Sequence, residues 1–524
     1  MAADGGDTVH YVFGESALDI PTLVGISTRA VGTRLSEEPI VLRTVARSAD
    51  HVSAILANEG QIYGVTTGYG DSVVRGVDSN LVHDLPLHLT RFHGCGLGRF
   101  LTPEETRATL AVRLVTLMRG WSGVSLPLVE LLAEMLRRDI LPMIPAEGSV
   151  GASGDLTPLS YVAGALAGER DVLHRGTVKL AREAFAAEGL STHTLLPKEA
   201  LAIMNGTAVM TALTAIAIQQ SQWLADAATR LTAMCSVAML GNPQHFDARL
   251  FAAKPHPGQM RVAARVRDDL QSFTAGHEPS RMQDRYSLRC APHVIGVLED
   301  AMPLFRSMLE TEINSSNDNP LFDPATGDVL HGGHFYGGHV CFVADSLKTQ
   351  TANLADLMDR QLASLVDTRF SNGLPPNLSG ATGPRATINH GFKAVQIAVS
   401  AWTAEACKLT MPASVFSRST ECHNQDKVSM GTIAARDALR VNQLVAQVAA
   451  AHYLAAAQAL ELRLREGTLG EAAVGPQLMS TLADIRQSAA FVTEDLPMDR
   501  TLASLTDDIL CGRLTPNYDN RLIA

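Results

Sequence analysis

The sequence predicts a mainly α-helical protein, with a bundle of long helices as its core and a loop-rich domain at its N-terminal end. Strand signals are scarce, because few runs alternate apolar and polar residues and aromatic side chains make up only 5% of the chain. Helical spacing dominates instead, in segments longer than the usual length of about 10 to 14 residues. We expect a loop-rich domain over residues 1–197 and a domain of long helices over residues 198–524.

The clearest helix start is at Thr102. It is followed by Pro103, Glu104 and Glu105, so a capping hydroxyl, a proline and early acids precede apolar residues at helical spacing through Met118. Apolar periodicity predicts the other helices over residues 126–136, 198–239, 296–313, 345–365, 389–409 and 430–465. Their length without a sustained heptad favours a bundle, and an oligomer that buries the faces of more than one chain.

Two segments are apolar enough to suggest a membrane span. Residues 200–225 carry no charged side chain and are long enough to cross a bilayer. Polar residues such as Asn205, Thr211 and Gln219 interrupt them, and residues 441–460 are similarly Ala-rich with polar interruptions. We interpret both segments as buried helices of a large core, not as membrane spans.

The composition argues against several classes of protein. With 43 Lys+Arg against 54 Asp+Glu, the net charge of −11 lacks the basic character typical of nucleic-acid-binding proteins. A small molecule or a protein is therefore the expected partner. Seven cysteines without a close-set pair indicate a reducing compartment, and the N-terminus has neither the cationic start nor the apolar run of a signal peptide. We expect a cytoplasmic location.

Glycine-rich segments interrupt the helices, and loops on a rigid scaffold carry function disproportionately. These segments begin at Tyr63, His93, Gly148 and His331. The one at residues 148–155 lacks the Lys-Ser/Thr and the preceding strand of a phosphate loop, and it lacks the Gly-x-Ser-x-Gly frame of a serine nucleophile. His331, His334 and His339 lie close in sequence but match no zinc spacing, so we predict no metal site.

One run, Gly-Ser-Val-Gly-Ala-Ser-Gly-Asp-Leu-Thr-Pro-Leu-Ser-Tyr from residue 148, resembles the signature of the aromatic amino acid ammonia-lyases and 2,3-aminomutases. In that family Ala-Ser-Gly, here Ala152, Ser153 and Gly154, cyclises and dehydrates to 4-methylideneimidazol-5-one, an electrophile that requires no exogenous cofactor. Gly154 suits this chemistry, because its nitrogen must attack the Ala152 carbonyl in a compressed backbone. Ser153 must lose water to become the exocyclic methylene. An amine bound to that methylene becomes a better leaving group.

Several separated motifs extend the resemblance over nearly the whole chain. The run Tyr-Gly-Val-Thr-Thr-Gly-Tyr-Gly resembles the family's mobile inner loop, which implies that its first residue, Tyr63, is the catalytic base. Residues 197–207 match the segment that places Asn205 beside the prosthetic group. Residues 283–290 match the segment whose arginine, here Arg289, binds the substrate carboxylate, a role that suits a bidentate guanidinium. The resemblance further implies four site residues, Tyr286, Asn319, Asn424 and Gln425.

Phe92 and His93 resemble the pair that reads the far end of the substrate ring in this family. Phe92 offers a phenol hydroxyl no partner, and leaving that group unpaired costs about 1–3 kcal/mol, which disfavours tyrosine. His93 could hydrogen-bond an imidazole, but histidine-specific members usually have Glu where this chain has Gln425. Histidine and phenylalanine both remain open. His334, where relatives usually have Asn, is predicted to add a polar contact near Phe335 and to favour a polar ring.

The resemblance implies an ammonia-lyase/fumarase-like fold and a homotetramer whose active sites draw loops from more than one subunit. Tyr69, Arg285 and residues 332–339 are more similar to the branch that contains the aminomutases, so we expect a 2,3-aminomutase that forms the β-amino acid. The alternative is an ammonia-lyase that releases ammonia and urocanate or cinnamate. The outcome depends on how well the inner loop seals the site before ammonia escapes.

Two further alternatives have less support in the residues. A catalytically silent helical scaffold would be marked by loss of Tyr63, Ser153 or Arg289, and all three are present. The wider fumarase-like superfamily relies on a Gly-Ser-Ser-x-Met-Pro loop, which this chain lacks. Val115 stands where many relatives have Asn, and the sequence offers no interpretation of this difference.

Overall fold

The computed structural model describes residues 10–274, 278, 279, 281–516 and 518. The chain divides into two compact units, each assembled from segments that are distant in sequence. Unit 1 comprises Met1–Ile216, Arg306–Asp345 and Pro412–Arg436, and unit 2 comprises Ala217–Phe305, Ser346–Met411 and Asp437–Ala524. The domain boundary at residue 197 stays a prediction.

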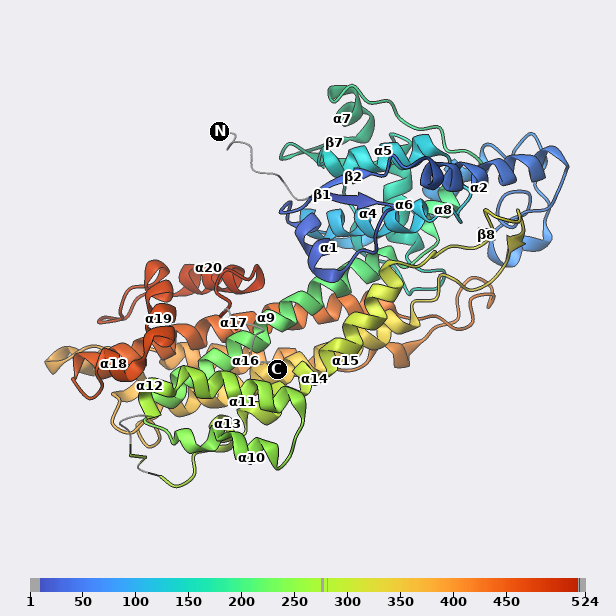
Figure 1. Cartoon of the computed structure of the whole chain (residues 1–524). Coiled ribbons are helices and arrows are strands. Elements are labelled where there is room, and N and C mark those ends of the chain that lie inside the picture. The colour runs from blue at the N-terminus through green and yellow to red at the C-terminus, as the bar shows by residue number, and fades with distance from the viewer. Residues whose placement is uncertain (1–9, 275–277, 280, 517, 519–524) are drawn as a thin grey trace. The chain divides into compact units, whose positions relative to one another are not determined.

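The described part of unit 1 combines helices with four small sheets. Its helices are α1 (Ile20–Ser27), α2 (Pro39–Ala57), α3 (Leu85–Phe92), α4 (Pro103–Met118), α5 (Leu126–Arg137), α6 (Leu156–Leu166), α7 (Ala181–Ala187) and α8 (Glu199–Met204). Its strands are β1 (His10–Phe13), β2 (Gly32–Leu35), β3 (Leu97–Phe100), β4 (Leu141–Pro142), β5 (Pro145–Glu147), β6 (Asp171–His174), β7 (Thr177–Leu180), β8 (Leu321–Phe322) and β9 (Val329–Leu330). β1 and β2 pair in parallel, whereas β3–β5, β4–β6–β7 and β8–β9 are antiparallel. Strands β1, β2, β7 and β8 are labelled in Figure 1.

Long helices dominate the rest of the chain. Four of them contribute residues to both units, namely α9 (Ala208–Ala238), α14 (Ala291–Ile313), α15 (Gly338–Val366) and α17 (Gly431–Arg465). The other helices of unit 2 are α10 (Ala248–Ala252), α11 (Pro257–Asp269), α12 (Gln271–Thr274), α13 (Tyr286–Arg289), α16 (Lys393–Lys408), α18 (Glu471–Val474), α19 (Pro476–Ser488) and α20 (Asp499–Leu510). The predicted fold class, a mainly helical protein with long helices, is confirmed.

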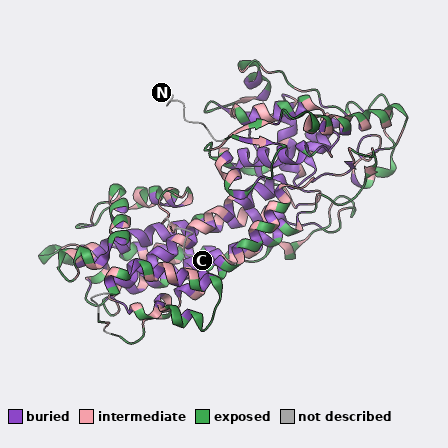
Figure 2. Cartoon of the chain, viewed as in Figure 1, coloured by how far each residue is buried: buried purple, intermediate pink, exposed green. Residues whose placement is uncertain are grey.

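The structure contains the features that were predicted from signals within a single helix. Thr102 caps α4 by accepting a hydrogen bond from the Glu105 N–H, with the reciprocal bond from the Glu105 side chain, and the helix ends at Met118. Residues 441–460 of α17 are almost entirely buried within the single chain, and Figure 2 shows the long helices coloured mainly as buried. Burial within the single chain therefore explains why residues 441–460 carry no charged side chain, and no partner subunit is needed to cover them. In the part of the chain that the structure describes, no helix is long and apolar enough to cross a membrane.

The largest difference from prediction lies in the helix expected over residues 198–239. It is broken at Asn205, between α8 and α9, where the backbone turns to φ −85° and ψ 95°. The carbonyl oxygens of Ala202 and Asn205 accept hydrogen bonds from the buried guanidinium of Arg113, a residue of α4. A side chain distant in sequence therefore supplies hydrogen-bond donors to the carbonyl oxygens at the end of α8. The apolar periodicity of residues 198–239 carries no information about that donor, so it could not predict the break.

Other boundaries also differ. Helices α14 and α15 begin at residues 291 and 338, earlier than the expected 296 and 345, whereas α16 begins at 393 instead of 389. Strand β5 precedes the glycine-rich segment at Gly148, where no strand was expected. Two of its three residues are buried, and it pairs with the exposed strand β3, so the pairing depends on a partner that a local pattern does not reveal.

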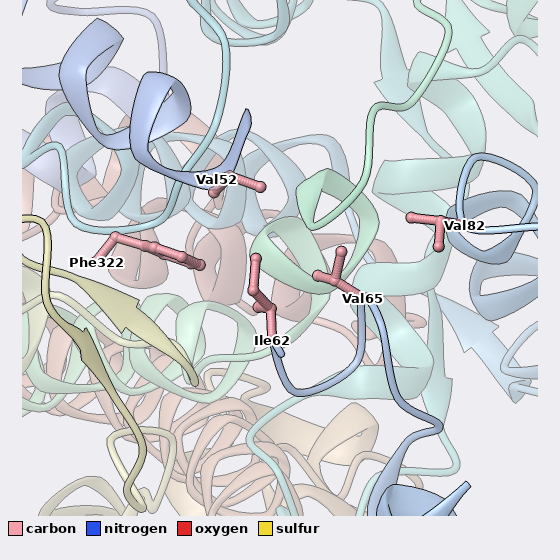
Figure 3. Close-up of a cluster of buried hydrophobic side chains, with 5 residues drawn as sticks. All are labelled: Val52, Ile62, Val65, Val82 and Phe322. Carbon is pink, nitrogen blue, oxygen red and sulfur yellow. The ribbon is translucent and has the colours of Figure 1, made fainter. Parts of the chain in front are cut away.

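A small hydrophobic cluster anchors the inner loop. Val52, Ile62, Val65, Val82 and Phe322 lie together in unit 1 and are at most 5% exposed (Figure 3). They come from four segments of the chain, and two of them, Ile62 and Val65, stand on either side of Tyr63, the predicted catalytic base. The base of the inner loop is therefore held by apolar burial.

Candidate active site

A cavity of about 350 Å³ in unit 1 brings together residues from five of the sequence motifs. Its lining residues are Tyr63, Gly68, Tyr69, Gly70, Ser72, Leu89, Phe92, His93, Ser153, Leu156, Leu201, Asn205, Glu421 and Gln425. The inner loop, the end of α3, the Ala-Ser-Gly segment, α8 and the late polar segment each contribute. This size suits a single small molecule.

Tyr63 is half-buried, and its hydroxyl oxygen accepts a hydrogen bond from the Gly70 N–H at 2.8 Å. Burial raises the pKa of Tyr63, while the bond from Gly70 lowers it and the charge of Glu421 raises it. An acceptor bond at the phenolic oxygen stabilises the deprotonated form, which a base requires. Burial also raises the pKa of Tyr69.

Glu421 is a cavity residue that the sequence analysis missed. Both of its carboxylate oxygens accept from the Asp71 N–H, at 2.9 and 3.0 Å. Gly70 has a φ of +56°, and a Cβ at this position would overlap the Glu421 carboxylate. Glu421 thereby fastens the inner loop to the late polar segment. It stands four residues before Gln425 in that segment, so its position in the motif was the available signal.

The predicted prosthetic-group residues are held by hydrogen bonds from two other motifs. Gln425 Nε2 lies 3.2 Å from Ser153 Oγ, and Asn205 Nδ2 donates to the Ser153 carbonyl at 3.3 Å. Gly154 has a φ of +70° and lies against Gly206, with which it forms a β-bridge. Asn205 and Gln425 therefore both contact Ser153, one at its carbonyl oxygen and the other at its hydroxyl oxygen, and their predicted roles stay predictions.

Asp155, directly after Gly154, holds the Ala-Ser-Gly segment at its C-terminal end. Its fully buried carboxylate accepts from Thr432 Oγ1 at 2.5 Å and from the Met210 N–H at 2.9 Å, and its own N–H donates to the Gly206 carbonyl. Burial raises the pKa of Asp155 to about 6, although these donors act in the opposite direction. The segment is thus fixed at its C-terminal side by several independent bonds.

The residues around Ala152, Ser153 and Gly154 fit a compact group made from the backbone. Asn205 is 3% exposed, and its Oδ1 is a buried acceptor with no hydrogen-bond partner among the described residues. No side chain fits at Gly154, because a Cβ there would overlap Gly206. Close backbone packing and an unused acceptor are therefore present where the resemblance places the prosthetic group.

Phe92 and His93, the predicted ring-reading pair, lie at another part of the cavity wall. The rings of Phe92 and His93 have centroids 4.3 Å apart, and the ring of Tyr69 lies 6.4 Å from that of Phe92. His93 Nδ1 lies 3.1 Å from the Leu89 carbonyl, which can only accept, so Nδ1 carries the proton. Burial lowers the pKa of His93, which favours the neutral ring. The neutral ring then has Nε2 as a hydrogen-bond acceptor.

Other predicted residues of unit 1 do not line this cavity. Asn319 Oδ1 accepts from the Gly332 N–H at 2.9 Å, and Asn424 is exposed. His334 is exposed and lines a separate cavity of about 920 Å³, while its neighbour Phe335 is half-buried. Their predicted contacts with substrate stay predictions.

Tyr286 and Arg289 belong to unit 2, on α13. Tyr286 is 71% exposed, and the Arg289 guanidinium carbon lies 4.6 Å from the centre of its ring. Arg289 Nε donates to the Asp284 carbonyl at 3.0 Å, which leaves its terminal nitrogens for another partner. Among the described residues, no group of three or more His, Cys, Asp or Glu side chains is arranged to hold a metal ion.

Comparison with known proteins decides the family. The family model for aromatic amino acid lyases matches residues 18–487. The chain belongs to the aromatic amino acid lyase family. It is 36% identical to the histidine ammonia-lyase of Gloeobacter violaceus over 508 residues, which cover 95% of this chain and 97% of that protein. It is 35% identical to the tyrosine ammonia-lyase of Cereibacter sphaeroides over 501 residues, covering 91% of this chain and 94% of that protein.

The fold agrees with that of a solved aminomutase. The tyrosine aminomutase of Streptomyces globisporus superposes with a TM-score of 0.88 at 31% identity, over 97% of this chain and 98% of that one. The chain is therefore an enzyme of the family that includes both lyases and aminomutases. The names of the relatives in sequence fit the lyase alternative better than the aminomutase activity that we expected, and that expectation is not confirmed.

Proposed function

We propose that this enzyme is an ammonia-lyase that acts on an aromatic L-α-amino acid, with histidine as the first substrate to test and phenylalanine and tyrosine as the comparisons. The observation that carries the proposal is the cavity in which Tyr63, Ser153, Asn205 and Gln425 come together. The relatives named above as ammonia-lyases support the reaction type.

The proposed prosthetic group is 4-methylideneimidazol-5-one, made from Ala152, Ser153 and Gly154. When present, it supplies an electrophile that converts the substrate amine into a better leaving group. Asn205 and Gln425, which contact Ser153, would hold it. The uncommitted Oδ1 of Asn205 is available to accept a further hydrogen bond at this position.

Tyr63 is the proposed base for the β-hydrogen. A weakly acidic C–H bond requires a base that is held in place, and the Gly70 N–H fixes the phenolic oxygen of Tyr63. Glu421 holds the loop that carries Gly70 by bonding to the next residue, Asp71. The remaining task is to bind the carboxylate, which we assign to Arg289.

His93 supports histidine as substrate. Its Nε2 is an acceptor in the cavity, and an imidazole N–H is a matching donor. Phenylalanine would leave this acceptor without a partner but would pack against Phe92, whereas tyrosine would offer its hydroxyl. The polar acceptor therefore favours histidine over phenylalanine.

We further propose a homotetramer with shared active sites. Arg289 and Tyr286 lie in unit 2, and the family resemblance implies sites that draw loops from several subunits. Ile397 of α16 and Phe342 of α15 are apolar side chains left 63% and 51% exposed in the single chain. Light scattering of the purified protein measures the assembly, and a monomer would contradict this proposal.

The decisive experiment is incubation of the purified enzyme with histidine, phenylalanine and tyrosine separately, with analysis for ammonia, the arylacrylate and the β-amino acid. We expect ammonia and urocanate in equal amounts from histidine. The β-amino acid as main product would establish an aminomutase instead. Ser153→Ala is expected to abolish turnover without changing the assembly, and full activity in this variant would refute the prosthetic-group assignment.

A further inference from the structure

Two glycines from separate segments lie back to back beside the Ala-Ser-Gly segment. Gly154 and Gly206 form an isolated parallel β-bridge, and the Asp155 N–H donates to the Gly206 carbonyl at 2.7 Å. A Cβ on Gly154 would overlap the Gly206 carbonyl group and lie 2.8 Å from its Cα. The segment is thus pressed against the break between α8 and α9.

Arg113 lies on the other side of Gly206. Its side chain is fully buried, and a Cβ on Gly206 would overlap its guanidinium. The guanidinium donates to the carbonyl oxygens of Ala202, of Asn205 at 3.2 Å and of Asn317 at 2.9 Å. The guanidinium holds these groups in one fixed geometry, because its donors are spread over a rigid planar fork, whereas the three donors of a lysine share a single nitrogen. Arg113 therefore backs the turn against which Gly154 rests.

A buried ion pair stiffens this arrangement. Lys198 Nζ lies 2.7 Å from Asp318 Oδ2, and neither side chain is exposed. Lys198 immediately precedes α8, and Asp318 follows Asn317, so the pair ties together the same two segments that Arg113 bonds. Breaking a buried pair is costly, so the two segments hold a fixed spacing.

We infer that Arg113 is a positioning residue for the self-catalysed formation of the prosthetic group, because it holds the turn at Asn205 and Gly206 against Gly154 and keeps the Ala-Ser-Gly segment compressed. The inference rests on the proposed function, in which this segment cyclises. Compression of the backbone brings the reacting atoms of the segment toward each other before any chemistry occurs.

The chemistry balances without an oxidant. In ring closure, the Gly154 nitrogen forms a bond to the Ala152 carbonyl carbon, and the carbonyl oxygen leaves as water with the amide protons of Ser153 and Gly154. In the second step, the Ser153 Cα proton and hydroxyl group leave as another water, which creates the methylene. Two waters are lost, and the mass of the intact chain records both.

Arg113→Lys tests the inference, because lysine keeps the charge but loses the fork of donors. Protein made in a short pulse of cell-free synthesis is sampled over time, and mass spectrometry of the folded fraction counts the waters lost. We expect wild-type chains to lose two waters. The variant should do so up to about 100-fold more slowly, the loss that a misplacement of reacting groups by about 1 Å can cause.

Arg463→Lys is the matched control. Arg463 of unit 2 is also buried and donates to three carbonyl oxygens, those of Ala238, Ser371 and Asn372. The substitution removes a similar set of bonds elsewhere, so we expect dehydration at the wild-type rate. Gly206→Ala is the second test variant, since its Cβ would displace the Arg113 guanidinium, and it should also slow dehydration.

Equal dehydration rates in the wild type and Arg113→Lys would overturn the inference, as would equal slowing in the two arginine variants. If Arg113→Lys does not fold, Gly206→Ala decides, and a wild-type rate in that variant overturns the inference. A folded wild-type protein that loses no water would instead refute the prosthetic group, which is the failure of the proposed function itself.

Discussion

Replacing His93 by Leu should lower kcat/KM for histidine much more than for phenylalanine. His93 Nδ1 is committed to the Leu89 carbonyl, and burial lowers the pKa of the ring, so at pH 7 the neutral side chain has only Nε2 left as an acceptor. Without it, a bound imidazole leaves a buried N–H unpaired, at a cost of about 1–3 kcal/mol. At about 1.4 kcal/mol per factor of ten, the expected loss is roughly 5- to 150-fold.

The assay measures kcat/KM from the absorbance of the arylacrylate, with histidine, phenylalanine and tyrosine as separate substrates. His88→Leu is the matched control, because His88 lies on the same helix, α3, but is exposed and does not line the cavity. It should leave all three values unchanged. Equal losses for histidine and phenylalanine in His93→Leu would refute the reasoning, and a loss confined to tyrosine would assign Nε2 to a phenol.

Three further predictions follow from the contacts around the cavity. Glu421→Ala should speed amide hydrogen exchange at Asp71 roughly fivefold, because it removes a hydrogen bond of about 1 kcal/mol. Glu421→Gln keeps an acceptor and should leave the exchange rate unchanged. Equal exchange rates in the two variants would contradict the role of Glu421 in holding the loop. Burial raises the pKa of Asp155 from 3.8 to about 6, so folding takes up a proton at this carboxyl between those two pH values. The stability that protonated Asp155 contributes is therefore full below about pH 4 and is lost as the pH rises through about 6. Asp155→Asn should flatten that part of the Tm profile, and an unchanged slope would sink the assignment. Lys198→Ala leaves Asp318 buried and unpaired, so it should lower the free energy of unfolding by about 3–5 kcal/mol in denaturant titration, and a change below about 1 kcal/mol would show that the pair is unimportant.

The fold was predictable where the deciding signal is local. Thr102 and Glu105 form the expected capping box, and the apolar spacing of residues 126–136 reappears as α5 with one residue added. The break at Asn205 was not predictable, because it depends on Arg113, which is 92 residues away in sequence. A periodic apolar segment looks the same whether or not a distant guanidinium takes its carbonyl oxygens.

The site was predictable to a similar degree. The motifs identified Tyr63, Ser153, Asn205 and Gln425, which share one cavity. They did not identify Glu421, because its role is to bond backbone groups of another loop, and a motif records residue types but not the partners they meet. Leucines of the cavity wall, Leu89, Leu156 and Leu201, also escaped notice, since apolar residues in helices predict a core.

The hydrophobic anchor described above determines which part of the inner loop is free to vary. Ile62 and Val65 are buried on either side of Tyr63, and the Val65 N–H donates to the Ile62 carbonyl at 3.1 Å. This turn therefore holds one end of the inner loop in a fixed position. Glu421 and Tyr63 hold the other end of the loop at Asp71 and Gly70, so any motion that admits substrate falls to the segment between these two fixed ends. Redesign of the loop for a slower or faster exit of product can thus be confined to residues 66–69. This leaves Tyr63, the proposed base, and the N–H groups of Gly70 and Asp71 in place.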